Sequence, residues 1–302
     1  MKKLLIFSLL FFIACSYLCG QTKSNMKKDT TKGFDFFVSP GMYVGHKKNA
    51  NYYRGVPSPI ESDYVDPDIN YVLKNPHWRN HIMDLIKQNH RGVVGNDFWL
   101  DDLSGMRYTT NMSFGIGARY RFSKHLSIGV SFTQAWMIAH GVAYLGVKIM
   151  ETNSNDRIKC LLVGKEKRNF FELNINYLFL SEGILSPILE AGMHVNSTKV
   201  NGADLVVEDV PFSMINRYGP GVVYDPSLSY IETTRRMGGT GYGFSAALGL
   251  RISITKWAAL EPLAQFRLEK VNLAGYNDIT PNYNFMIRLV VGDKVFAKTV
   301  KE

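Results

Sequence analysis

The chain has little cysteine and no long apolar run beyond its first twenty residues. It contains three cysteines in 302 residues, and two of them, Cys15 and Cys19, lie in the apolar start of the chain. If that start is removed, only Cys160 remains, so no intramolecular disulfide can form. No later run of about 18 apolar residues exists, which excludes a membrane-spanning helix from the rest of the chain.

Sequence signatures of catalysis and of nucleotide binding are also missing. There is no Gly-x-Ser-x-Gly motif for a nucleophilic serine. The glycine-rich stretch Gly238-Gly239-Thr240-Gly241 lacks the lysine that follows in a phosphate-binding loop, so it is interpreted as a flexible strand entry. The sequence therefore favours a protein without a cofactor that is not an enzyme.

The start of the chain indicates export. Met1-Lys2-Lys3 precedes an apolar stretch from Leu4 to Leu18, the pattern of a secretory signal. We expect a signal peptide over 1–20, with lipidation of Cys15 or Cys19 as the alternative, and a periplasmic lead-in over 21–32. Loss of Lys2 and Lys3 lowers the formal charge from +9 to +7. An exported basic protein meets anionic lipid headgroups rather than nucleic acid.

Large apolar residues alternate with small or polar ones along much of the mature chain. The segment Met112–Phe122 places Met, Phe, Ile, Ala, Tyr and Phe on one face and Ser, Gly and Arg on the other. Successive side chains of a strand point to opposite faces. An exported chain without a spanning helix can enter a membrane only as a closed barrel with the apolar face outward, or stay soluble as a sandwich or barrel with that face inward.

The same alternation predicts eight strands. They cover 33–45, 112–122, 126–136, 171–179, 189–195, 242–254, 260–269 and 283–291. The connections after the second, fourth and sixth strands are short, whereas the others are long or variable, near 60 residues for the first and near 40 for the third. Short periplasmic turns that alternate with longer outer loops are typical of an outer-membrane barrel. We therefore expect an all-β, transmembrane, antiparallel up-and-down barrel over 33–296, with a periplasmic tail over 297–302.

The chain resembles the small outer-membrane β-barrel proteins, which include the OmpX-like, OmpA-transmembrane-domain-like and PorT-like "porin family" barrels. The resemblance covers roughly Gly33 to Phe296. It depends on strand number, loop alternation and phrases such as Phe114-Gly115-Ile116-Gly117-Ala118-Arg119-Tyr120. It implies a cell outer-membrane location in a Gram-negative envelope, with Phe296 as the aromatic residue that ends such barrels. A ten-stranded count, with an extra hairpin near Asp204 to Val210, stays open.

Ionisable residues of the polar face are expected to meet inside the barrel. Eight strands enclose a lumen that side chains nearly fill, and an unpaired buried charge is costly. Threading the strands up and down gathers seven residues in the periplasmic half. They are Asp35, Arg119, Arg121, Glu190, Arg251, Glu261 and Arg288. We interpret them as a salt-bridge network that plugs the lumen, with a gated ion path as the alternative.

The first long loop contains a predicted helix. Asn75 suits the N-cap and Pro76 the first turn, and four apolar residues recur at helical spacing. They are Trp78, Ile82, Leu85 and Ile86. This apolar face packs on the barrel rim or the lipid interface, or it docks a partner protein.

Three other sites in the loops are possible. His77 and His81, with His90 or Asp84, have the spacing of a metal site. An acidic run, Glu61, Asp63, Asp66 and Asp68, offers oxygen ligands for Ca²⁺ but lacks the spacing of a calcium loop. A lipid-modifying enzyme would need Ser104 with one of those histidines and Asp101 or Asp102. Solvated loop charge is the simpler interpretation of the histidine set and the acidic run.

The third and fourth strands are expected to continue beyond the membrane. Val142–Met150 and Arg157–Gly164 are rich in apolar residues and flank a turn-like stretch at 151–156. Such a hairpin would expose a sheet edge to a partner strand, and Cys160 would be a surface thiol on it. The expected partners are outer-membrane lipid, lipopolysaccharide and other outer-membrane proteins, in a structural, surface-recognition or complex-subunit role. A narrow channel is the rival function.

Overall fold

The computed structural model describes residues 32–54, 69, 73, 76–149, 155–179, 184–214, 238–255, 257–273 and 276–292. The expected signal peptide, almost all of the lead-in, the acidic run of the first loop and Phe296 lie outside these residues. Among the described residues, no helix is long and apolar enough to cross a membrane.

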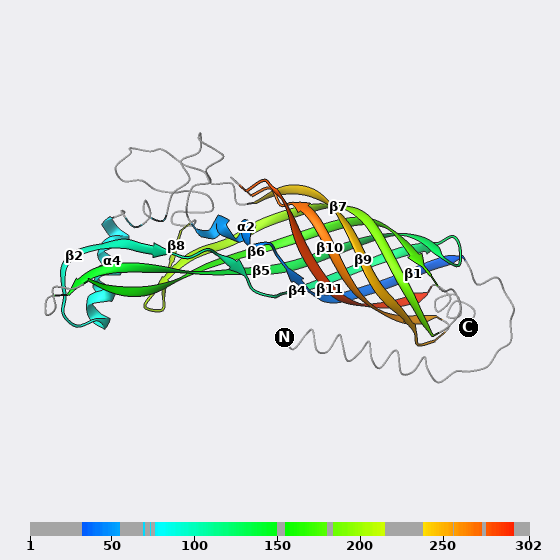
Figure 1. The fold of residues 1–302 in the computed structure, drawn as a ribbon, viewed down its shortest axis with the longest axis horizontal. Helices are drawn as coiled ribbons and strands as arrows, with labels where there is room; N and C mark the ends of the chain where they lie inside the picture. The colour runs from blue at the N-terminus through cyan, green and yellow to red at the C-terminus, as the bar shows by residue number, and fades with distance from the viewer. Residues whose placement is uncertain are drawn as a thin grey trace, which may run out of the picture.

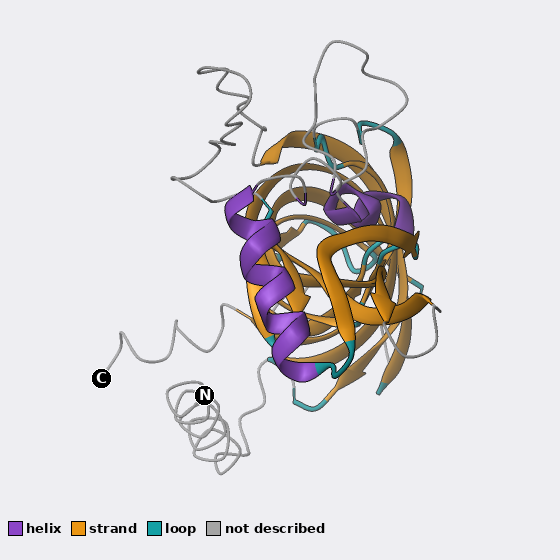
Figure 2. Ribbon diagram, turned by 90° about the vertical axis from the view of Figure 1, so that its left-hand side faces the viewer, coloured by secondary structure: helices purple, strands orange, loops and turns teal. Residues whose placement is uncertain are grey.

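Eight of the described strands close into an antiparallel ring, as Figures 1 and 2 show. Their bounds are β1 (Gly33–Val44), β4 (Asn111–Arg121), β5 (Leu126–Ile149), β6 (Asn155–Leu178), β7 (Leu185–Val207), β9 (Gly238–Ser253), β10 (Ala258–Lys270) and β11 (Ile279–Gly292). Neighbours in the chain pair in order, and β1 pairs with β11 to close the ring. Because the ring has no free edge, its backbone groups are satisfied within the sheet. The predicted all-β barrel is confirmed.

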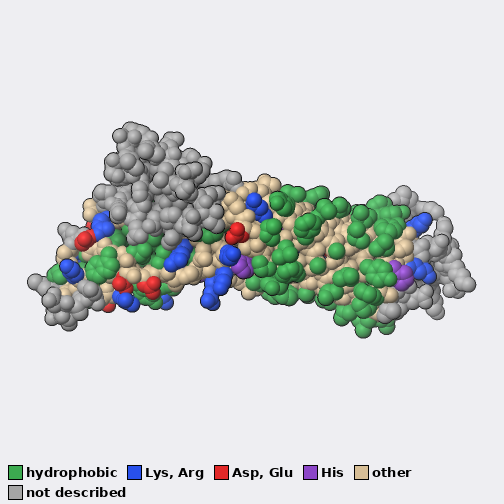
Figure 3. Space-filling model, turned by 45° about the horizontal axis from the view of Figure 1, so that its top comes forward, with side chains coloured by type: hydrophobic (Ala, Val, Ile, Leu, Met, Phe, Trp, Pro, Cys, Tyr) green, Lys and Arg blue, Asp and Glu red, His purple; other side chains and the backbone are tan. Residues whose placement is uncertain are grey.

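The barrel wall has an apolar outside and a polar inside. Its exposed large side chains, which form the apolar belt, gather over the barrel on the face that Figure 3 shows, and they come from all eight ring strands. Examples from four strands are Phe36, Ile116, Val130 and Phe285. Buried polar residues occupy the alternate positions of the same strands, as Asp35 and Arg119 do on β1 and β4, where they are register partners. This arrangement is that of a membrane-spanning barrel, since a soluble barrel would place the apolar face inward.

Three strands run far beyond the ring and build a second layer, which we call the extension. It consists of the outer ends of β5, β6 and β7 together with β2 (Val93–Leu103), β8 (Val210–Ser213) and α4 (Pro76–Asn89). In Figure 1 the extension lies on the left, at the end opposite the start of β1. The short strand β3 (Arg107–Tyr108) pairs with β5 where the extension joins the barrel.

One expectation about the loops is confirmed and another changes. The third and fourth predicted strands do continue as a long hairpin, because pairing of β5 with β6 runs from Leu126↔Tyr177 to Lys148↔Asn155. The extra hairpin near Asp204 to Val210 exists as β7–β8, with positive φ at Glu208 and Asp209 as a tight two-residue turn requires. It widens the extension and adds no strand to the described ring, which keeps eight.

The polarity of β5, β6 and β7 inverts between the barrel and the extension. Outward positions of β6 are apolar at Phe171 and Ile175, whereas in the extension they include Lys167, Lys165 and Lys159 beside the exposed Leu161. Inward positions change in the opposite sense, from polar to apolar. On β6 they change from Asn176, Asn174 and Glu172 to Leu162, Cys160 and Ile158. Lipid must therefore surround the lower part of these strands and water the upper part.

A charge placed outside the barrel tests this boundary. Ile116, in the middle of β4, is 51% exposed, and Leu161, on the outer face of the extension, is 46% exposed. Ile116→Arg should lower the free energy of unfolding by about 2–4 kcal/mol, the cost of arginine at a bilayer midplane. The matched variant Leu161→Arg should change it by less than about 0.5 kcal/mol, as exposed sites in water do.

The measurement is equilibrium urea unfolding of the protein refolded into phospholipid vesicles. Equal destabilisation by the two substitutions would contradict the inversion.

Candidate functional site

The lower half of the lumen holds a connected set of ion pairs, which we call the inner network. Arg119 lies at its centre, with Nε 3.1 Å from Asp35 and the two terminal nitrogens 3.0 and 2.6 Å from Glu261. Arg121 reaches the other Asp35 oxygen at 3.1 Å. The structure thus joins β1, β4 and β10 across the lumen by charge-assisted hydrogen bonds.

The remaining members attach to Glu261 from the other side of the barrel. Arg251 on β9 lies 2.9 Å from Glu261, and Arg288 on β11 lies 3.6 Å from it. Arg288 also contacts Glu190 on β7 at 2.9 Å. All seven residues that the sequence places in the periplasmic half are therefore linked in one network. Glu261, fully buried, connects three arginines.

A second set of charges, the outer network, lies in the upper half of the lumen. Arg168 is fully buried, with Nε 2.6 Å from Glu166 and Nη1 3.1 Å from Glu269. Its Nη2 donates a hydrogen bond to the Tyr108 hydroxyl at 3.0 Å. The imidazole of His194 lies 3.3 Å from Glu269. Between the two networks, Arg267 binds Glu172 at 2.9 Å and lies over the ring of Phe170.

Sequence reasoning missed the outer network. The alternation already places Glu172, Arg267 and Glu269 on the polar face, so counting every charge on that face would have found them. Glu166 and Arg168 precede residue 171, where the predicted fourth strand begins, although β6 itself begins at Asn155. Tyr108 also points into this network.

Two short helices close over the outer end of the lumen. They are α2 (Lys47–Ala50) and η1 (Asn51–Arg54). Asn49 donates to Thr280 on β11 at 3.0 Å, and the Tyr53 hydroxyl donates to Glu166 on β6. The Tyr276 hydroxyl donates to the carbonyl of Asn51 at 3.1 Å. The segment is thereby tied to opposite sides of the ring and lies above the outer network.

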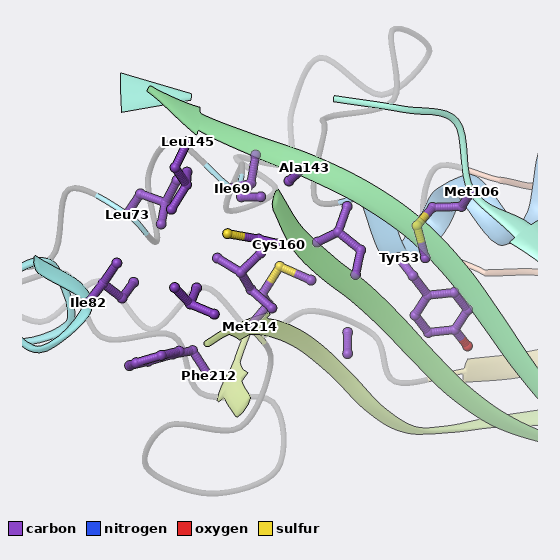
Figure 4. Close-up of a cluster of buried hydrophobic side chains, with 14 of the residues drawn as sticks. Tyr53, Ile69, Leu73, Ile82, Met106, Ala143, Leu145, Cys160, Phe212 and Met214 are labelled. Atoms are coloured by element: carbon purple, nitrogen blue, oxygen red, sulfur yellow. The ribbon is translucent and has the colours of Figure 1, made fainter. Parts of the chain in front are cut away.

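The predicted docking helix forms, but its apolar face is already covered. Ile82 and Ile86 are fully buried, Trp78 is 9% exposed, and Leu85 packs partly buried against the same cluster. The side chains that cover them come from the inward face of the extension, among them Phe212, whose ring lies 5.7 Å from that of Trp78. Figure 4 shows this core. The interpretation of these four residues as an exposed partner-docking face is wrong, because they are the core of the extension.

Cys160 also belongs to this core, so it is not a surface thiol. Its side chain is buried beside Leu162 and Leu205. Burial, together with the charge of Glu208, raises the pKa of the Cys160 thiol to about 12. Because the thiolate is the reactive form, Cys160 is an inert packing residue.

The other loop candidates are not assembled into sites among the described residues. His90 pairs with Glu208 at 2.8 Å, and the ring of His81 packs edge-on against Phe212. The described residues contain no group of three or more histidine, cysteine or acidic side chains placed to hold a metal. The Ser104 hydroxyl accepts a hydrogen bond from the backbone of Val142 at 2.7 Å, and Asp101 pairs with Arg157. The side chain of His77 lies outside the described part.

The closed ring, the apolar belt and the charged lumen define a β-barrel membrane protein with an outward extension.

No family model matches the chain, and no curated protein is similar to it in sequence. Several solved structures are similar at low identity. Neisserial surface protein A is 10% identical, with 86% of this chain and 96% of that one covered and a TM-score of 0.39. Ail of Yersinia pestis, solved with the heparin analogue sucrose octasulfate, is 8% identical, with 86% and 97% covered and a TM-score of 0.34. OprG of Pseudomonas aeruginosa is 12% identical, with 86% and 94% covered and a TM-score of 0.32. The likeness is distant, and the fold is defined by the strand pairing of this chain itself.

Glu261 is the residue whose loss should cost the most stability. Glu261→Gln removes the carboxylate from three arginines, and breaking a buried ion pair in this way typically costs about 3–5 kcal/mol. The matched variant is Asp278→Asn, whose carboxylate is 59% exposed and lies 3.7 Å from Lys48. An exposed pair is worth about 0–1 kcal/mol.

Urea unfolding of both variants in vesicles measures the difference. A Glu261→Gln variant as stable as the wild type would show that the inner network does not hold the barrel together.

Proposed function

We propose that this protein is a closed, non-enzymatic outer-membrane barrel that holds the extension at the cell surface. The polarity inversion of β5, β6 and β7 carries the proposal. It supports a chain that leaves the hydrocarbon layer and continues into water on the side opposite both ends of the described barrel. A packed core beyond the membrane adds nothing to membrane insertion. We therefore assign the extension a role at the cell surface, either surface recognition or contact with other subunits of a larger assembly.

A closed lumen is supported by three layers of side chains along the barrel axis. The inner network lies at the periplasmic end, the Glu172–Arg267 pair lies in the middle, and the outer network lies beneath α2 and η1. An eight-stranded ring leaves an interior that side chains nearly fill. The role of the charges is then to stabilise the closed barrel by pairing with each other. The rival function is that of a narrow channel.

Lipopolysaccharide is the proposed lipid partner, because a basic patch lies just above the apolar belt. Lys167 on β6 and Lys199 on β7 are register partners on the outward face. Lys165 lies two residues before Lys167 on β6 and faces the same way. Lys167 also pairs in register with Trp136, an exposed belt residue. Like charges directly opposite each other destabilise a sheet. Lys167 and Lys199 form no ion pair with another described residue, so phosphate groups of the surrounding leaflet are suitable counterions.

Surface labelling tests the orientation. Lys159 lies on the outward face of the extension and Lys124 in the β4–β5 turn at the opposite end. In a Cys160→Ala background, Lys159→Cys should react with a membrane-impermeant maleimide on intact cells. Lys124→Cys should react only after the outer membrane is permeabilised. Labelling in the reverse order, or of neither variant after permeabilisation, would overturn the proposal.

Conductance separates the closed barrel from the channel. The wild-type protein in planar bilayers should show no steady open state, because paired charges and α2–η1 fill the path. The double variant Glu166→Ala/Arg168→Ala removes a matched pair from the outer network only, so it should also stay closed while the inner network is intact. Regular unitary currents from the wild type would establish the rival function.

A further inference from the structure

Among the described residues, the inner network at the periplasmic end of the lumen contains more arginines than carboxylates. The inner network contains four arginines and three carboxylates, which leaves one positive charge in excess. The two arginines nearest the opening are the more exposed members, Arg121 at 27% and Arg251 at 17%. Lys124 is exposed in the adjacent turn.

These cations surround a small cavity. It has a volume of about 30 Å³ and is lined by Arg119, Arg121, Lys124, His125, Arg251 and Asn176, among others, with Glu261 as the acidic group in its wall. About 10–15 Å³ on this measure holds one water molecule, so a small ion fits. Both Glu261 oxygens already accept hydrogen bonds from Arg119, which offsets the repulsion that this carboxylate would exert on an anion.

The wall also offers hydrogen-bonding groups that the protein leaves unused. Arg121 Nε is buried without a hydrogen-bond partner among the described residues. Asn176 is 4% exposed, its amide nitrogen donates to Asn174, and its Oδ1 has no described partner. His125 Nδ1 bonds the carbonyl of Leu178 at 2.7 Å, which fixes that nitrogen as the donor. A buried polar atom without a partner is costly unless water or a ligand satisfies it.

We propose that this cavity is a binding site for a protonated oxyanion of the phosphate class. The cations take the charged oxygens, and Asn176 Oδ1 accepts a hydrogen bond from the P–OH group. Sulfate has the same shape but no proton at neutral pH, so it leaves Asn176 Oδ1 unsatisfied. The headgroup of a phosphodiester lipid lacks the proton for the same reason. The site therefore selects inorganic phosphate, which keeps a proton at neutral pH, and this inference does not depend on the proposed surface role.

Calorimetric titration of the folded mature protein in a neutral detergent tests the site. Inorganic phosphate should bind, and sodium sulfate should bind at least about tenfold more weakly, because a site with an unpaired buried acceptor rejects the analogue without the proton. Vesicles that contain phosphatidylglycerol should not compete. Lys124→Gln, in an exposed turn where folding is not at risk, should weaken phosphate binding several-fold, and Lys48→Gln at the opposite end should leave it unchanged.

The acceptor role of Asn176 has its own test. Asn176→Ala should bring the affinities for phosphate and sulfate to within about twofold of each other while both still respond to Lys124→Gln. Three results would overturn the proposal: no heat at millimolar phosphate, equal binding of phosphate and sulfate by the wild type, or competition by phosphatidylglycerol vesicles.

Discussion

Closure of the sheet is the constraint on which the rest of this structure depends. In hydrocarbon no water is available to satisfy a strand edge, so each backbone group of the ring must find its partner in a neighbouring strand. The pairing of β1 with β11 meets that requirement and joins the two ends of the described barrel. Closure also fixes the lumen width, and a lumen of eight strands brings residues far apart in sequence into contact. Asp35, Arg119 and Glu261 meet for this reason.

The charged lumen and the apolar extension are two solutions to one packing problem. Inside the membrane the outward positions must be apolar, so the inward positions contain the polar residues, and ions are paired because burial is costly. Beyond the membrane the outward positions face water, and the inward positions are free to form an ordinary dry core. Ala143, Leu145 and Cys160 in the extension occupy the same strand faces as Thr133, Ser131 and Asn174 in the barrel. One set of strands thus serves two solvents.

Much of the barrel could be predicted from the sequence because a period-two pattern is local. Each of the eight ring strands overlaps its expected segment, and parity alone placed Asp35, Arg119 and Glu261 on the same inner surface. The extension was harder to predict. Its inward residues, such as Ala143 and Leu162, are small or apolar, and some outward residues, such as Leu161, are apolar too. The alternation of apolar and polar residues is therefore weaker there than in the barrel. The apolar face of α4 looked equally suited to a partner or to its own chain, since the sequence does not show which strands rise beside it.

The continuous strands also constrain how the molecule can be assembled. In the proposed orientation, α4, β2 and β8 stand on the outer side, and the proposed export delivers the chain from the periplasm. The proposed closed lumen contains Arg168, Glu269 and the other paired charges, and it offers no path for a folded helix. In the proposed membrane setting, the first loop must therefore cross while the ring is still open. The joining of β1 to β11 is then a late event, because it closes the ring through which the first loop must pass.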